Sequence, residues 1–172
     1  FAYDSETNQT YGVTRGLPSI GNPKVLVIPI GFKNEAIPKN VVDNLEKAFF
    51  GTSADTGWES LSSYYYKSSY GKVNITGTVL DVYQTGNTTS YYDNLYKKYL
   101  DKLDDYYNYE TDEYPDSVEW SIIKEALEYY DNKIDYSEYD TDDDGYIDSI
   151  YLIYLNEYNT DDNSLWWAFS DE

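Results

Sequence analysis

One nine-residue segment of the chain carries the residue types best suited to chemistry. Residues 140–148 read Asp-Thr-Asp-Asp-Asp-Gly-Tyr-Ile-Asp, so carboxylates recur at alternate positions. A calcium loop takes oxygen ligands from its first, third, fifth, seventh and ninth positions, and it needs a glycine at the sixth for a sharp turn. This register predicts a calcium site with the following ligands: Asp140, Asp142, Asp144, the Tyr146 carbonyl and Asp148.

The segment departs from an EF-hand at its twelfth position, where a bidentate Glu is required and the chain has Tyr151. Residues 146–155 are rich in β-branched and aromatic residues, which favours a strand over an exit helix. We therefore expect a helix–calcium loop–strand unit with a further ligand from elsewhere, and Asp135 and Glu138 are the nearest carboxylates. The alternative is a solvated acidic turn, because Asp-Gly is common in turns.

The composition excludes several classes of function. With 32 acidic and 12 basic residues the net charge is −20, which disfavours nucleic acids and anionic membranes as partners. No stretch approaches the ~20 apolar residues of a membrane span. The chain has no Cys and no His, so disulfides and nucleophiles activated by His are excluded. A calcium loop suits extracellular calcium concentrations, so we expect a secreted protein.

The hydrophobic pattern predicts one layered domain over residues 24–172, after a polar lead-in segment over residues 1–23. Lys24–Phe32 is a continuous apolar run, typical of a strand buried on both faces, but Pro29 favours a bulge or a free edge there. We expect an α/β or α+β fold with a small mixed sheet backed by helices. Further strands are expected over 73–83, with a bulge near its middle, and 146–155, and helices over 41–49, 58–69, 92–103 and 118–130.

Aromatic residues are the other conspicuous feature, with 23 Tyr in the chain. Tyr clusters at 64–66, 91–92, 106–107 and 129–130 have helical spacing, which favours packing at the core boundary over a binding surface. Leu165–Phe169 forms an apolar block in an acidic tail, which predicts burial against a partner. Among 32 carboxylates, no pair is singled out for glycoside hydrolysis.

Several short patterns occur in one order between residues 24 and 155. They are Ile30-Gly31-Phe32, Phe49-Phe50-Gly51, Tyr64-Tyr65-Tyr66, Ser69-Tyr70-Gly71-Lys72-Val73, Gly77-Thr78-Val79, Tyr91-Tyr92, and Ile134 to Asp140 before the Asp-Gly loop. In this order the chain resembles the N-terminal part of the catalytic domain of the immune-inhibitor-A-like family of secreted bacterial zinc metallopeptidases. The resemblance implies a zincin-like fold, structural calcium, and zinc held by a His-Glu-x-x-His helix beyond the calcium loop.

The resemblance implies zinc ligands that this chain lacks, because a chain without His cannot supply the ligands of that helix. We expect no catalytic residues here, with zinc and a protein or peptide substrate only in a longer parent protein, whose C-terminal half would dock on this truncated subdomain. The chain is then the calcium-binding N-terminal portion of a secreted metallopeptidase, inactive alone. The alternative is a stand-alone calcium-dependent extracellular binding or adhesion module, which should present an exposed aromatic patch.

Overall fold

The computed structural model describes residues 2–4, 9–11, 16–109, 117–156 and 165–166, with side chains in 16–103, 117–156 and 165–166. Two short strands near the N-terminus, β1 (Ala2–Asp4) and β2 (Gln9–Tyr11), form an antiparallel pair of their own. Among the described helices, none has both the length and the apolar character needed to cross a membrane.

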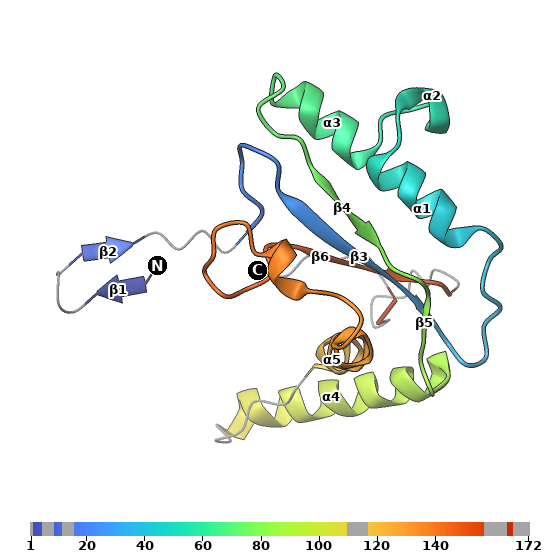
Figure 1. The fold of residues 1–172 in the computed structure, drawn as a ribbon. Helices are drawn as coiled ribbons and strands as arrows, with labels where there is room; N and C mark the ends of the chain where they lie inside the picture. The colour runs from blue at the N-terminus through green and yellow to red at the C-terminus, as the bar shows by residue number, and fades with distance from the viewer. Residues whose placement is uncertain (1, 5–8, 12–15, 110–116, 157–164, 167–172) are drawn as a thin grey trace.

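A small parallel sheet lies at the centre of the molecule (Figure 1). Its central strand is β3 (Lys24–Gly31), and β4 (Thr76–Val79) and β5 (Tyr83–Gln84) both pair along one of its edges. The opposite edge pairs with β6 (Ile150–Tyr154). All three pairings with β3 are parallel, so the prediction of an α/β fold is confirmed and that of a mixed sheet is wrong.

The described helices cover both faces of the sheet, which gives a three-layer arrangement (Figure 1). They are α1 (Val41–Phe50), α2 (Ser53–Thr56), α3 (Leu61–Ser68), α4 (Thr89–Tyr109), α5 (Val118–Tyr130) and the 3-10 helix η1 (Tyr136–Tyr139). Helices α1 and α3 pack on one face, while α4, α5 and η1 pack on the other.

The alternation of side chains along β3 explains both layers of the core. Val25 and Val27 point toward α1 and α3, while Leu26, Ile28 and Ile30 point toward α4 and α5. All five side chains are fully buried, as the continuous apolar run predicts. Burial of each such side chain contributes about 1.5–3 kcal/mol to folding, so β3 is the main hydrophobic support of the fold.

Pro29 is accommodated in the central strand because its missing N–H falls where no partner strand requires it. The carbonyls of Val27 and Gly31 accept from the amides of Leu80 and Thr85, so odd-numbered groups of β3 face the β4–β5 edge. By alternation the nitrogen of Pro29 faces the same edge, opposite the interruption between β4 and β5. The strand expected over 73–83 is therefore divided after Val79, and the bulge expected near its middle is a break.

The structure changes the expected end of one helix and identifies the N-cap of another. Helix α4 was expected to end before Asp104 but continues to Tyr109, because a polar stretch without Gly or Pro does not by itself stop a helix. Helix α5 begins as predicted, and its N-cap is Ser117, whose hydroxyl accepts from the amide of Trp120 at 3.2 Å.

The two described residues of the C-terminal apolar block, Leu165 and Trp166, contribute to the core of this same chain. Leu165 is fully buried and Trp166 is 7% exposed. The Trp166 ring lies 4.8 Å from that of Phe32 and 5.4 Å from that of Tyr154, both nearly edge-on. For these two residues the expectation of burial against a partner is therefore wrong; residues 167–169 lie outside the described part of the chain.

Candidate metal centre

The acidic segment lies in the connection between α5 and β6. After α5 the chain turns into η1, and the side chain of Asp135 accepts from the Ser137 amide at 3.0 Å as its N-cap. Tyr139, at the end of η1, is buried in the same core cluster as the apolar face of α5. The loop over residues 140–149 then leads directly into β6, so both of its ends are held by packed elements.

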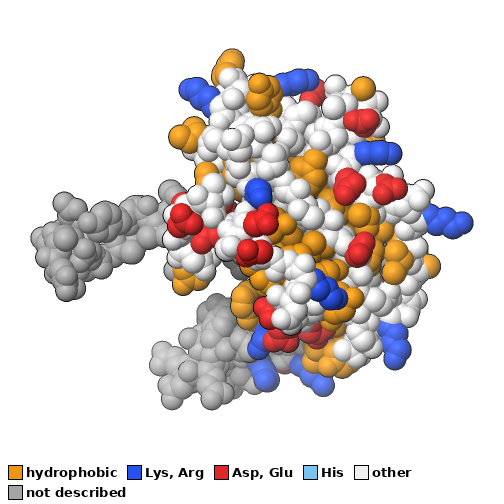
Figure 2. Space-filling model, viewed as in Figure 1, with side chains coloured by type: hydrophobic (Ala, Val, Ile, Leu, Met, Phe, Trp, Pro, Cys, Tyr) orange, Lys and Arg blue, Asp and Glu red, His pale blue; other side chains and the backbone are white. Residues whose placement is uncertain are grey.

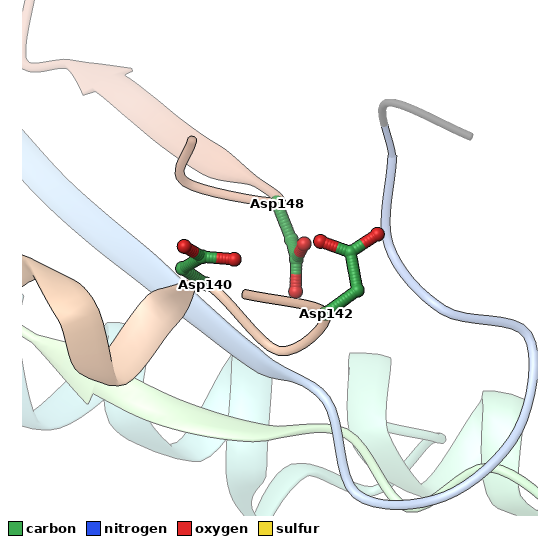
Figure 3. A group of neighbouring side chains, drawn as sticks. All are labelled: Asp140, Asp142 and Asp148. Carbon is green, nitrogen blue, oxygen red and sulfur yellow. The ribbon is translucent and has the colours of Figure 1, made fainter. Parts of the chain in front are cut away.

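Three carboxylates of this loop converge (Figure 3). Asp140, Asp142 and Asp148 each offer an oxygen, and these oxygens lie within 4.8 Å of one another. Two oxygens on opposite sides of one calcium ion would lie about 5 Å apart, since calcium–oxygen distances are about 2.3–2.6 Å. Asp142 is exposed and the other two are half-buried. The spacing of the oxygens therefore fits ligands of one hard cation.

The loop backbone is wrapped around two of these carboxylates. Asp140 accepts from the amides of Asp144 at 3.0 Å and Gly145 at 2.8 Å. Asp148 accepts from the Thr141 amide at 3.0 Å, which closes the loop across its width. Gly145 has a φ of 88°, the left-handed conformation that the glycine of a calcium loop supplies.

Mutual repulsion is the main electrostatic feature of the cluster. The pKa of the Asp142 carboxyl is raised, chiefly by partial desolvation and then by the negative charges of Asp144 and Asp148. Figure 2 shows acidic side chains gathered on the surface over this loop. A bound divalent cation would offset this repulsion.

Three other carboxylates considered as ligands, those of Asp144, Asp135 and Glu138, do not join the cluster in this structure. Asp144 lies outside the converging group, and one of its oxygens accepts from the Tyr146 amide at 2.9 Å. Asp135 accepts from the amide and hydroxyl of Ser137, which lowers the pKa of its carboxyl. Glu138 forms an ion pair with Lys24 at 2.7 Å. The two extra ligand candidates are thus engaged elsewhere.

The sequence carries a local signal for the position of Asp135 but none for that of Glu138. The Asp135-Tyr136-Ser137 pattern carries an N-cap signal that could have been recognised. The Lys24–Glu138 pair joins residues 114 positions apart, and no local pattern indicates it.

The Tyr clusters divide between core and surface. Tyr92 and Tyr130 are buried, whereas the other described members of the clusters are exposed: Tyr64, Tyr65, Tyr66, Tyr91 and Tyr129. The side chains of the 106–107 pair lie outside the described part of the chain.

Within the described residues, the three aspartates are the one group of three or more metal-binding side chains that converge. The chain contains neither His nor Cys, so these residues do not fit a catalytic zinc site of the His-containing kind. Comparison of the chain with family models, with curated proteins and with solved structures found no match.

Proposed function

We propose that the loop over residues 140–148 binds one calcium ion and thereby fixes the start of β6. The observation that carries the proposal is the convergence of Asp140, Asp142 and Asp148, whose oxygens lie within 4.8 Å of one another. The spacing of these residues in the chain matches the first, third and ninth positions of a calcium loop. Loop carbonyls, Asp144 after a rotation of its side chain, and water can complete the six to eight oxygens that calcium takes.

Calcium fits this loop better than magnesium. Magnesium demands an octahedral shell near 2.0–2.1 Å and keeps most of its water, whereas calcium tolerates many protein oxygens in an irregular shell. The loop offers several carboxylates and backbone carbonyls on a short, exposed segment, and the net charge of −20 favours divalent cations in general.

The expected effect of the ion is structural. The Asp148 amide donates to the Tyr139 carbonyl at 2.9 Å, so the two ends of the loop already meet where η1 stops. From this point β6 runs along the edge of β3. An ion that neutralises the carboxylates of the loop would stabilise this junction, and with it the pairing of β6 at the sheet edge.

We further propose that the chain is the calcium-binding N-terminal portion of a secreted bacterial zinc metallopeptidase with a zincin-like scaffold. The order of the short patterns between residues 24 and 155 supports this assignment, together with an acidic loop followed by a strand. Without His the chain cannot supply the zinc ligands of that family, so in this proposal it is inactive alone. Zinc, and the protein or peptide substrate, belong to a longer parent protein.

A second candidate function is a calcium-dependent extracellular binding module, and exposed aromatic side chains around α3 favour it. Trp58 is 72% exposed and Tyr70 is 94% exposed. Tyr70 also has a φ of 57°, a left-handed conformation that costs a non-glycine residue about 1–2 kcal/mol. Strained backbone conformations cluster at active sites and ligand-binding segments, so Tyr70 is a candidate contact residue of such a module.

A matched pair of variants tests the calcium proposal. Asp142→Asn removes a converging carboxylate, while Asp143→Asn removes the same charge from the same loop at a position outside the cluster. At ~1 mM calcium and a dissociation constant of ~10 µM, binding adds about 2.7 kcal/mol, which raises Tm by about 5–10 °C. Asp143→Asn should keep this shift and Asp142→Asn should lose most of it. Equal shifts in both variants would contradict the assignment.

The two wider candidates are separated by the intact mass of the protein secreted by its natural host. A mass well above 20.0 kDa, with a His-Glu-x-x-His segment in the added sequence, supports the metallopeptidase. A mass near 20.0 kDa contradicts it and leaves the binding module.

A further inference from the structure

The outer edge of β4 is open in the described part of the chain, where β4 pairs with β3 alone. The amides of Thr76 and Leu80 donate to carbonyls along the β3 segment at 3.0 and 2.9 Å. Backbone groups of successive residues in a strand point to opposite edges. The N–H and C=O groups that face outward are therefore those of Ile75, Gly77 and Val79.

A groove of about 620 Å³ follows this edge. Six consecutive residues, Asn74–Val79, form one side of it. The outward carbonyl of Ile75 accepts from the Ser62 hydroxyl at 2.6 Å, which marks one end of the open segment. The remaining lining residues come from the end of α1 and the chain that follows: Glu46, Lys47, Phe50, Gly51, Asp55 and Ser62.

The chemistry of this groove specifies an extended chain as its occupant. Outward donors and acceptors recur every second residue, about 6.6–6.8 Å apart, and another strand presents its own groups at the same interval. Addition of a peptide to a sheet edge uses this match for affinity and the side-chain contacts for specificity. The open segment of β4 has room for a peptide strand of about three or four residues.

Charge indicates what kind of chain fits. Glu46 and Asp55 line the groove with negative charge, and the pKa of the Asp55 carboxyl is lowered chiefly by hydrogen bonds from Thr52 and to a smaller extent by the charge of Lys47. The three charged lining residues leave one net negative charge, on a chain whose net charge is −20. A second copy of this chain or an acidic peptide would be repelled, whereas a basic peptide would be attracted.

We propose that the outer edge of β4 binds an extended segment of another protein that carries Lys or Arg side chains, and that this segment adds a strand to the sheet. The site is separate from the calcium loop, because that loop leads into β6 on the opposite edge of β3. It therefore does not depend on calcium binding.

The probe is the acetylated and amidated peptide Lys-Val-Lys-Val-Lys, titrated into the full chain and followed by amide hydrogen exchange and NMR shifts. The amides of Gly77 and Val79 should gain protection, while that of Thr76, already bonded toward β3, should not change. The same peptide N-methylated at alternate residues should not bind, because it lacks the donors that pair with β4. The peptide Glu-Val-Glu-Val-Glu should bind more weakly than the basic probe.

Two charge reversals complete the test. Glu46→Lys, in the groove, should weaken binding by about fivefold, while Asp101→Lys, exposed on α4, makes the same charge change and should leave it unaltered. Equal binding of the N-methylated peptide overturns the proposal, and so do shifts confined to Leu152 and Tyr154, whose amides face the outer edge of β6. If protection of the β4 amides rises with protein concentration in the absence of peptide, the edge binds a second copy of the chain and the proposal is overturned.

Discussion

Replacement of Trp166 by Ala tests whether the C-terminal apolar block stabilises this chain from within. The ring is 7% exposed and packs edge-on against Phe32 and Tyr154. Burial of a Trp removes about 200 Å² from water, which at about 25 cal/mol per Å² gives at most about 5 kcal/mol. Trp→Ala substitutions in cores cost about 3–5 kcal/mol, so we expect the free energy of unfolding to fall by about 4 kcal/mol.

A second substitution separates packing from hydrogen bonding at the same position. The indole Nε1 of Trp166 donates to the carboxylate of Asp93 at 2.6 Å. Trp166→Phe keeps an aromatic ring but removes this donor, and a hydrogen bond to a charged group contributes about 1.5–3 kcal/mol. We expect Trp166→Phe to lose about 2 kcal/mol, between wild type and the Ala variant.

Urea unfolding followed by far-UV circular dichroism measures both variants. Trp120→Ala is the control, because Trp120 is 56% exposed, and it should change the free energy of unfolding by less than about 1 kcal/mol. A loss below about 1 kcal/mol for Trp166→Ala, with an unchanged m-value, would refute the burial of this ring in the core.

Two further predictions concern stability. The Tyr154 hydroxyl is buried without a hydrogen-bond partner among the described residues. Tyr154→Phe should therefore raise the free energy of unfolding by about 1 kcal/mol. A clear loss of stability in thermal unfolding would show instead that the hydroxyl is paired. Hydrogen bonds from the Thr52 hydroxyl and amide hold the pKa of the Asp55 carboxyl below its usual range. The stability that these bonds give to the folded chain is therefore present above about pH 4 and is lost as the pH falls through the lowered pKa. The difference in urea midpoint between wild type and Asp55→Asn should therefore shrink between about pH 6 and about pH 3, and a constant difference would contradict the linkage.

The core of the fold could be predicted from the sequence because its signals are local. The apolar run over residues 24–32 identifies the strand buried on both faces, and Gly51 marks the end of the first helix, where its amide bonds back to Lys47. The parallel direction of β6 depends on how two distant segments approach each other, and short-range patterns do not carry that information.

Pro29 shows how a correct local signal can lead to an incomplete inference. Its missing N–H predicts a free edge, yet β3 has strands on both edges. The gap between β4 and β5 supplies the free edge at one residue only. Such a gap is a property of the partner strand, so it does not follow from residues near Pro29.

At the candidate site, the sequence identifies the loop but not the final positions of its side chains. Asp140, Asp142 and Asp148 converge, while the Asp144 side chain accepts from the Tyr146 amide. The long-range ion pair of Glu138 could not be foreseen either, because it depends on where β3 lies in the fold.

The central claim is tested most directly by titration of calcium into the full chain at neutral pH, with the heat of binding as the readout. The proposal predicts one site per chain with a dissociation constant on the order of 10 µM, and weaker binding of magnesium. No heat above dilution at calcium concentrations up to about 1 mM, the level that extracellular modules require, would contradict it. The loop over residues 140–148 would then be a solvated acidic turn.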